Sequence, residues 1–215
     1  MYINRIFIKK GLRILGVFVG LVFALAIIVS LPTIVRGYDM YKNAISSEPI
    51  EIKVMTIKSD ENYLRLSEIP KEYTEALIDS EDQRFYSHIG IDFQSTFRAV
   101  LENIKAKSYV QGGSTITQQL AKNMYFTFEK RLDRKVAELL VAFKLEQTFS
   151  KDDILELYCN VTYMGNGCYG INEASRYYFD KAPDELTQEE IEQLVQTIKN
   201  PGYRNPNSLS EDGTL

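Results

Sequence analysis

Residues 81–92 read EDQRFYSHIGID, and the rest of the chain is organised around this stretch. It holds three carboxylates, an arginine and the single histidine of the protein within twelve residues. Gly90 lies beside this histidine, His88, where a tight turn favours glycine. A segment so polar and aromatic is poor core material. It is either a solvated loop held by aromatic anchors or the edge of an active site, and the stretch by itself leaves both interpretations open.

The bulk composition indicates one medium domain with an appendage. The chain has 215 residues and 45% hydrophobic content, which is ordinary for a globular protein. Residues 1–36 carry five basic side chains and no acid, whereas the remaining residues hold 20 basic and 29 acidic side chains. A domain this acidic is a poor general binder of nucleic acid, so we exclude that class of function.

The two cysteines, Cys159 and Cys168, carry no sign of a metal site. With one histidine in the chain, a zinc site built from cysteine and histidine is not expected. Buried structural thiols are one interpretation of this pair. A disulfide closing a short loop is the alternative if the domain lies outside the cytoplasm.

Residues 14–35 contain no charged side chain and are rich in Val, Leu, Ile, Phe and Ala. As a helix they would span about 33 Å, enough to cross a bilayer core of about 30 Å. A cleaved signal peptide is the rival interpretation, but the only Ala-x-Ala pattern here lies inside the run instead of after it. We therefore predict an uncleaved single-pass anchor. The excess of basic residues before it places residues 1–13 in the cytoplasm and the rest of the chain outside.

Residues 36–59 are predicted to form a stalk with one short strand at Ile50–Val54, where apolar and charged residues alternate. Beyond it we expect a mainly α-helical domain over residues 60–205, followed by a C-terminal tail over 206–215. Capping boxes begin at Ser150 and Thr187, and Ser114 is expected to cap a helix starting at Thr115. The predicted helices cover about residues 67–80, 93–104, 115 onward, 132–148, 151–158, 171–178 and 188–200. In the second of these, Phe93, Phe97, Val100 and Leu101 share one face.

The helix that contains Glu138 is apolar almost all round, which predicts a buried helix. We expect a core stripe made of Val136, Leu139, Leu140 and Phe143, with Val141, Ala142 and Leu145 on the opposite side. An unpaired carboxylate buried there would cost several kcal/mol. Glu138 therefore either forms an ordinary ion pair with Arg134 four residues earlier or lies at the floor of a cleft, and the sequence leaves both open.

Residues 112–123 read GGSTITQQLAKN and combine paired glycines with a helix start. Glycines allow a close approach of the backbone to a ligand, and a helix N-terminus favours an anion. A capped turn explains the first three residues without any ligand. It does not explain the hydroxyl, amide and ammonium groups along the following helix, which would suit sugar hydroxyls and phosphates.

Four segments taken in order resemble the signature of the peptidoglycan glycosyltransferases (glycosyltransferase family 51), the membrane-anchored enzymes that polymerise lipid II. The likeness extends over roughly residues 60–205. The segments are residues 81–92 (Glu-Asp-x-x-Phe-x-x-His-x-Gly-x-Asp), 112–119 (Gly-Gly-Ser-Thr-Ile-Thr-Gln-Gln), 134–138 (Arg-Lys-x-x-Glu) and 151–160 (Lys-x-x-Ile-Leu-Glu-x-Tyr-x-Asn). The resemblance implies an α-helical, lysozyme-like domain with a hydrophobic part that dips into the outer leaflet of the membrane.

The resemblance also implies the chemistry. Glu81 would be the general base that takes the proton of the acceptor 4-hydroxyl, and Glu138 the second essential carboxylate. An α-linked diphosphate donor and a β-1,4 product require inversion, with undecaprenyl diphosphate as the leaving group. Glu138 would orient the diphosphate, directly or through a divalent cation such as Mg²⁺ or Mn²⁺, or stabilise charge on the sugar. No covalently bound cofactor is expected, and a metal requirement stays open.

Further residues are assigned by their places in the motifs. Lys122, Arg134 and Lys135 would contact the diphosphate, with Lys130 as a lesser candidate. Ser114 and Gln119 would line the donor site, and Arg84 would belong to the same cleft. For four other residues we expect structural roles: His88 as a loop organiser, Asp92 as a helix cap, and Glu156 and Asn160 as ties between helix and loop.

The resemblance thus predicts a polymerase in the bacterial cell membrane, with its catalytic domain extracytoplasmic. Its partners would be lipid II, the growing glycan strand, the membrane and other cell-wall synthesis proteins. The sequence ends soon after the matching region and holds no penicillin-binding domain, so we expect a monofunctional enzyme, either complete or truncated. Two carboxylates would also suit a lysozyme-like or lytic glycan-cleaving enzyme, and a non-catalytic membrane scaffold is a third alternative.

Overall fold

The computed structural model describes residues 2–108, 112–127, 129 and 131–211, and for residues 2–15, 23, 24 and 209–211 it describes the backbone alone. The fold is mainly α, as predicted, and the described ranges contain no sheet. The helices are α1 (Tyr2–Ser47), α2 (Ile50–Lys58), α3 (Lys71–Glu81), α4 (Phe93–Ala106), α5 (Ile116–Tyr125), α6 (Leu132–Thr148), α7 (Lys151–Val161), α8 (Gly170–Phe179), α9 (Gln188–Lys199) and α10 (Pro206–Glu211).

Local sequence signals place most helix starts correctly. The side chains of Ser150 and Thr187 cap α7 and α9 in the predicted capping boxes. One cap differs from the prediction, because Thr115 and not Ser114 caps α5. The reason is the reciprocal box: the Thr115 side chain accepts from the backbone of Gln118, whose side chain accepts in return from the Thr115 backbone.

The predicted strand at Ile50–Val54 is wrong, since these residues open helix α2. Ile50 and Val54 lie four residues apart, share one helix face and are buried in the core, whereas Ile52 is 51% exposed. The alternating pattern of five residues was too short to distinguish the two-residue period of a strand from the 3.6-residue period of a helix. Residues 36–59 are therefore no extended stalk, because α1 continues to Ser47 and α2 joins the body.

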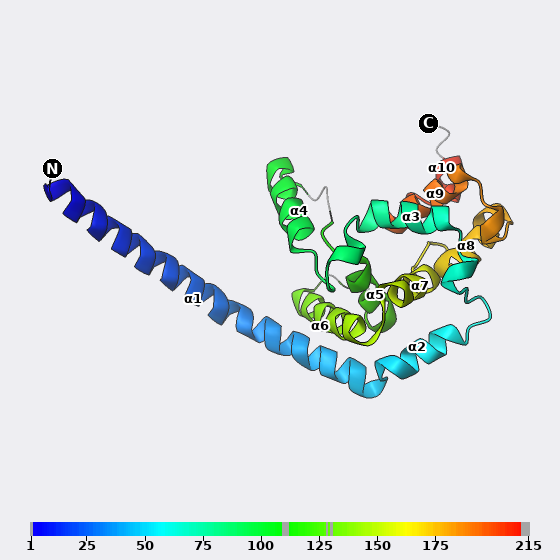
Figure 1. Ribbon diagram of the computed structural model, residues 1–215, viewed down its shortest axis with the longest axis horizontal. Coiled ribbons are helices and arrows are strands. Elements are labelled where there is room, and N and C mark those ends of the chain that lie inside the picture. Colours follow the sequence, from blue (N-terminus) through cyan, green and yellow to red (C-terminus); the bar gives the residue numbers. More distant parts are fainter. Residues whose placement is uncertain (1, 109–111, 128, 130, 212–215) are drawn as a thin grey trace.

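Helix α1 is a long helix that leaves the body of the molecule at an angle (Figure 1). The part from Gly16 to Ser47 is long and apolar enough to cross a membrane, with a mean hydropathy of 2.6 in its most apolar window and none of that window buried. Past the apolar run, α1 packs closely against α6. A Cβ at Gly37 would lie 2.5 Å from Cβ of Val136 and 2.7 Å from the carbonyl oxygen of Asp133.

This packing corrects the expected stripe on α6. The side chains of Val136, Leu139, Leu140 and Phe143 are only partly buried, whereas the fully buried ones are Ala137, Glu138, Val141, Ala142 and Leu145. Helix α1 covers part of the first face and α5 and α7 contact α6 as well. The predicted burial of α6 is thus complete on one face alone, and that face is the one predicted to lie opposite the core stripe.

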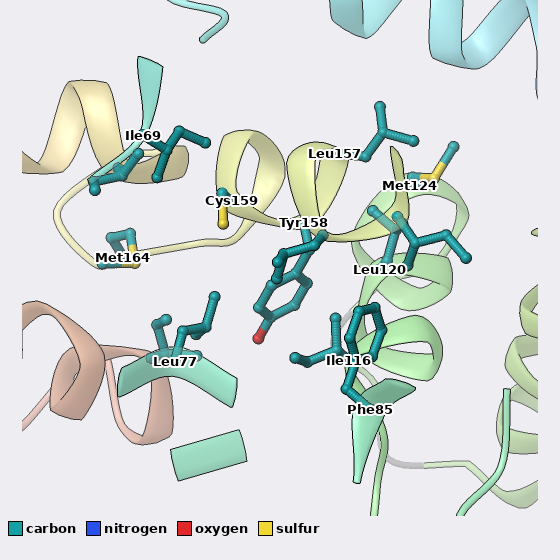
Figure 2. Packing of buried hydrophobic residues seen from close by; sticks show 14 of the residues in the cluster. Ile69, Leu77, Phe85, Ile116, Leu120, Met124, Leu157, Tyr158, Cys159 and Met164 are labelled. Atoms are coloured by element: carbon teal, nitrogen blue, oxygen red, sulfur yellow. The ribbon is translucent and has the colours of Figure 1, made fainter. Parts of the chain in front are cut away.

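The core centres on α5 and α7, with α3 packed against α9. Figure 2 shows the ring of Tyr158 pointing from α7 toward Leu77 and Ile116, with Phe85 beside the latter. Tyr158, Leu77 and Phe85 are fully buried. Cys159 and Cys168 are buried free thiols, the first of the two predicted states. Helix α4, in contrast, stands out from the body (Figure 1) and exposes the apolar face predicted for it, with Phe93 76% exposed and Phe97 64% exposed.

Candidate active site

A cleft of about 850 Å³ opens between the end of α3, the start of α4, the loop before α5, α5 itself, α6 and the end of α9. It gathers residues from the first three motifs, which lie as much as 57 positions apart in the sequence. Six of the nine predicted site residues line it: Glu81, Ser114, Gln119, Lys122, Lys135 and Glu138. Residues 81–92 could have been a solvated loop or the edge of an active site. The start of this stretch forms a wall of the cleft, which favours the second interpretation.

Glu81 is the last residue of α3, where the helix delivers its carboxylate to the cleft. The side-chain amide of Gln119 donates to Oε2 of Glu81 at 2.8 Å, and the Tyr158 hydroxyl donates to the Gln119 carbonyl oxygen at 3.0 Å. The other carboxylate oxygen, Oε1, is buried and has no hydrogen-bond partner among the described residues. One oxygen is thus held in place by Gln119, while the other is buried without a hydrogen-bond donor among the described residues.

Asp82 holds the loop after Glu81 in place. One of its two partners is His88, the residue predicted to organise this loop. The Asp82 carboxylate contacts Nε2 of His88 at 2.9 Å and accepts from the backbone N–H of Ile116 at 3.0 Å. Asp82 therefore ties the loop to the N-terminus of α5. A carboxylate there also offsets the positive end of the helix dipole.

A second anchor for the same loop is Glu146 on α6. Its Oε1 accepts from the backbone N–H of Gly90 at 3.0 Å, from the Thr117 hydroxyl at 2.6 Å and from Nζ of Lys151 at 2.6 Å. These donors belong to the loop, α5 and α7. Gly90 has φ +71°, a left-handed conformation that glycine adopts without strain. One buried oxygen thus fixes three motifs relative to one another.

Glu138 is fully buried at the cleft floor and lies between two cations. Nζ of Lys135 is 2.9 Å from its Oε2, and Nε of Arg134 is 3.0 Å from its Oε1, close enough for an ion pair although not aligned for a hydrogen bond. Lys135 also donates to the Ser114 hydroxyl at 2.8 Å. Both interpretations of Glu138 hold at once: it pairs with Arg134, and it forms the floor of a cleft.

Lys122 adds a further positive charge beside Lys135. Burial lowers the pKa of Lys122, and the charges of Lys135 and Arg134 lower it further, against the opposing effect of Glu138. Two cations thus pair with Glu138, and Lys122 adds a third whose charge interacts with both Glu138 and Glu81. The excess positive charge suits an anionic ligand group in the cleft.

Three predicted site residues do not line the cleft. Arg84 is engaged by Asp92, whose carboxylate accepts from Nε of Arg84 at 2.9 Å and from a second guanidinium nitrogen. The same carboxylate caps α4 by accepting from the backbone of Ser95 at 2.9 Å, as predicted. Arg134 pairs with Oε1 of Glu138 and donates to the Thr127 carbonyl oxygen at 2.5 Å. Lys130 lies outside the described residues.

Sequence reasoning missed a second cationic group at the cleft. Arg98 of α4, Lys199 at the end of α9 and Arg204 just beyond it all line the same cavity. They lie outside the four motifs, and α9 reaches the cleft only through its packing against α3. The one available signal was Arg98, a cation in the middle of a helix whose other face is apolar.

The two helix-to-loop ties predicted at Glu156 and Asn160 are present. Glu156 accepts from the Tyr63 hydroxyl and from the backbone N–H of Leu66. Asn160 donates to the Leu64 carbonyl oxygen and accepts from the Leu64 backbone N–H, each at 2.8 Å. Both residues therefore hold the segment before α3 onto α7.

The described residues do not fit a resident divalent cation. They contain no cluster of three or more His, Cys, Asp or Glu side chains that could hold a metal ion. Each oxygen of Glu138 already lies within 3.0 Å of a cation, so a divalent ion there would meet two positive charges at once. Asp82 is likewise committed to His88 and Ile116.

Comparison with known proteins agrees with this geometry. The model of the transglycosylase family matches residues 49–214. Penicillin-binding protein 1F of Bacillus subtilis (strain 168) is 49% identical over 141 residues, which are 66% of this chain and 20% of the relative. Penicillin-binding protein 1A of Aquifex aeolicus (strain VF5) is 44% identical over 144 residues, 67% of this chain and 20% of the relative. Penicillin-binding protein 1A of Neisseria cinerea is 40% identical over 203 residues, 91% of this chain and 25% of the relative.

The chain spans a fifth to a quarter of the length of these relatives. The family match, in contrast, covers all of the body, from just before α2 to beyond α10. It includes every residue that lines the cleft. The four ordered motifs had indicated the same family, and the chain belongs to it: the transglycosylases, or peptidoglycan glycosyltransferases.

Proposed function

We propose that this chain polymerises lipid II into β-1,4-linked glycan strands of peptidoglycan, inverting the donor anomeric carbon and releasing undecaprenyl diphosphate. One observation carries the proposal. The cleft combines a carboxylate that has an unpartnered oxygen, Glu81, with a cationic floor at Lys122 and Lys135. A base for a sugar hydroxyl and positive charge for a diphosphate are the two requirements of this reaction.

In the proposed step, Oε1 of Glu81 takes the proton of the acceptor 4-hydroxyl. The hydroxyl oxygen forms its bond to the donor anomeric carbon while the bond from that carbon to the diphosphate oxygen breaks. Because Gln119 holds Oε2, the carboxylate cannot rotate freely, and Oε1 is the oxygen that has no protein donor to displace among the described residues. A base must approach the proton donor to about 2.6–3.2 Å, which such positioning favours.

The electron pair of the broken bond leaves on the diphosphate, where negative charge grows. Lys122 and Lys135 stabilise this charge, since fixed cations in a partly dry cleft interact strongly with it. Glu138 acts as a positioning residue. It holds Lys135 at 2.9 Å, within reach of Ser114, and keeps the cations from repelling one another.

The second cationic group supports a cleft for two substrates. Arg98, Lys199 and Arg204 lie on elements other than those that bear Lys122 and Lys135. When lipid II serves both as donor and as acceptor, each molecule brings its own diphosphate. We assign the floor cations to the donor and the second group to the acceptor.

The chain would work at a bacterial cell membrane. The apolar part of α1 serves as a single-pass anchor with the N-terminus in the cytoplasm, and the body lies outside. The exposed side chains Phe93, Phe97 and Ile104 of α4 meet the outer leaflet. Lipid II, the growing strand and other cell-wall synthesis proteins are the partners of this proposal.

Polymerisation of labelled lipid II by the full chain in detergent, followed on a gel, tests the function. We expect Glu81→Gln to lower the rate by roughly 10²–10⁴-fold. The matched control is Glu75→Gln on the same helix, whose carboxylate is exposed, pairs with Lys71 and does not line the cleft. Cleavage of finished glycan strands without any polymer would favour the lytic alternative. Absence of turnover by the folded wild type would favour a scaffold, and a normal rate for Glu81→Gln would refute the base assignment.

A further inference from the structure

A second pocket, of about 280 Å³, is formed by α2, the segment after it, α5, α7 and the start of α8. It shares α5 with the cleft: Lys122 faces the cleft and the next residue, Asn123, faces the pocket. Its volume lies just below the 300–1,000 Å³ typical of sites for drug-sized ligands. It has room for one small ring and not for an extended strand.

The wall of this pocket is built from asparagines that are already satisfied. Asn160 donates to the carbonyl oxygens of Leu64 and Glu156, both at 2.8 Å, and Asn172 donates to the Asn62 carbonyl oxygen at 3.0 Å. Gly170 fits so tightly that a Cβ there would lie 2.4 Å from the Asn160 carbonyl oxygen. The pocket is therefore held in shape by its own hydrogen bonds.

Three other groups in the lining remain available to a ligand. The partly buried side-chain amide of Asn123 makes no hydrogen bond among the described residues. Asp60 engages one carboxylate oxygen, with the backbone N–H of Asn62 at 2.8 Å. Tyr169 is 51% exposed, and its ring lies 5.2 Å from that of Tyr163. Residues that carry an amide, a carboxylate and an aromatic ring thus line one small pocket.

The charge of the lining selects among ligand classes. It includes the carboxylates of Asp60 and Glu173 and, among the described residues, no lysine or arginine. The N-terminus of α8 is already occupied, because Glu173 accepts from the backbone N–H of Tyr169 at 2.8 Å. A phosphate or carboxylate would therefore meet like charge. A neutral ligand could donate hydroxyls to the carboxylates, accept from the amide and lay its C–H face on the tyrosine ring.

We propose that this pocket binds one neutral, N-acetylated sugar unit of a glycan strand, outside the catalytic cleft. The ligand class follows from the lining, and only the choice of a peptidoglycan-type sugar rests on the proposed function. A site of this kind would hold the strand at a point separated from the cleft by a single helix.

The test is a titration of the full chain in detergent with the β-1,4-linked trimer of N-acetylglucosamine, followed by ligand-observed nuclear magnetic resonance. The wild type should show saturable binding. Tyr169→Ala and Asn123→Leu should each weaken it by roughly fivefold or more. The matched control is Tyr177→Ala, a tyrosine of α8 that is 53% exposed, lies 5.0 Å from the ring of Tyr178 and is not part of the pocket. It should bind as the wild type does.

Three results would overturn the proposal: no saturation with the wild type, unchanged affinity in both pocket variants, or competition by an amine-bearing peptide in preference to the sugar. Circular dichroism establishes that each variant folds, and the second pocket variant keeps the test valid should one of them fail to fold. The lipid II assay separates this inference from the proposed function. If the chain makes polymer but binds no sugar in this pocket, the pocket proposal fails and the proposed function stands. If the chain binds sugar in this pocket but makes no polymer, the proposed function fails and the pocket proposal stands.

Discussion

The side-chain amide of Gln119 donates a hydrogen bond of 2.8 Å to Oε2 of Glu81, the proposed base. An amide can present either its N–H₂ or its oxygen to a neighbour, and only the former suits a carboxylate. The hydroxyl of Tyr158, which donates to the Gln119 oxygen at 3.0 Å, selects the correct orientation. A fully buried tyrosine thereby influences the geometry of Glu81 through the amide of Gln119.

Tyr158→Phe tests this control. Without the hydroxyl, the Gln119 amide can turn its oxygen toward Glu81, so we expect kcat/KM for lipid II to fall by about five- to tenfold, as for one lost hydrogen bond. The fall should appear in kcat and not in KM, because substrate contacts are unchanged. Tyr125→Phe is the control, since Tyr125 lies on α5, the helix that bears Gln119, and its hydroxyl donates to the Glu48 carbonyl oxygen instead. Equal activity of the two variants would contradict the orienting role of the Tyr158 hydroxyl.

Arg134→Met should destabilise the fold even though Arg134 does not line the cleft. It leaves the fully buried Glu138 with Lys135 as its nearest cation. We expect the free energy of unfolding to fall by roughly 1–3 kcal/mol, less than for a pair that loses its only partner. Denaturant titration measures it. Lys71→Met, which breaks an exposed pair with Glu75, should leave the transition in place.

The pH dependence of the reaction should report Lys122. Its lowered pKa means that it loses its proton at a lower pH than an ordinary lysine, whose pKa is about 10.4. In the proposed reaction the charged form of Lys122 holds the diphosphate, so the alkaline fall in kcat/KM should begin below that value. Lys122→Arg keeps the charge and should move the fall to higher pH. If the two profiles coincide, another group causes the alkaline fall.

Asp92→Asn should reveal an acid-sensitive contribution to stability. Its hydrogen bonds to Arg84 hold the pKa of Asp92 well below its ordinary value, so its stabilising effect is complete above the unfolded pKa of about 3.9 and is lost as the pH falls through the folded value. Asparagine still caps a helix with its carbonyl oxygen, so the substitution removes the charge and one of the two oxygens that accept from Arg84. The difference in Tm between wild type and variant should be largest near pH 6 and shrink below pH 4. A constant difference would refute the linkage.

Gly37→Ala should loosen α1 from α6. The new methyl group would lie 2.5 Å from Cβ of Val136, so the helices must separate. Overpacking of this kind costs about 1–3 kcal/mol, to be measured by thermal unfolding in detergent. Gly20→Ala is the matched control on the same helix, where a Cβ meets nothing within 4 Å. Equal Tm values for the two variants would show that the contact between the helices is dispensable.

Local signals in the sequence predicted what depends on near neighbours. The capping boxes at Ser150 and Thr187 were recognised because each lies within four residues, and the bounds of α6 follow from its composition. The same logic would have found Thr115 as the cap of α5, since only Thr115 has a glutamine three positions later that completes the box. Ser114 was chosen because it follows the glycines directly.

Other features depend on tertiary packing and could not be predicted. The pattern at Ile50–Val54 fits both a strand and a helix, and the choice is made by the core that Ile50 and Val54 enter. Arg84 was assigned to the cleft by its place in a motif, but Asp92 engages it instead. The contribution of Arg204 required α9 to pack against α3, a contact between distant segments. The roles of the motif residues in catalysis stay predictions for the experiments above.

The unbroken course of α1 sets the working height of the enzyme. The apolar run ends at Val35, and two residues later Gly37 already lies against α6, which at a rise of about 1.5 Å per residue is roughly 3 Å further along the axis. Arg36, between them, pairs with Asp133 of α6 at 3.6 Å. With the apolar run in a bilayer, α6 is held close to the membrane surface, because α1 continues without a break from the apolar run to its contact with α6. In the proposed reaction, the reacting bonds would therefore lie at the level of the lipid headgroups, and the finished strand would move away from a catalyst held at that height.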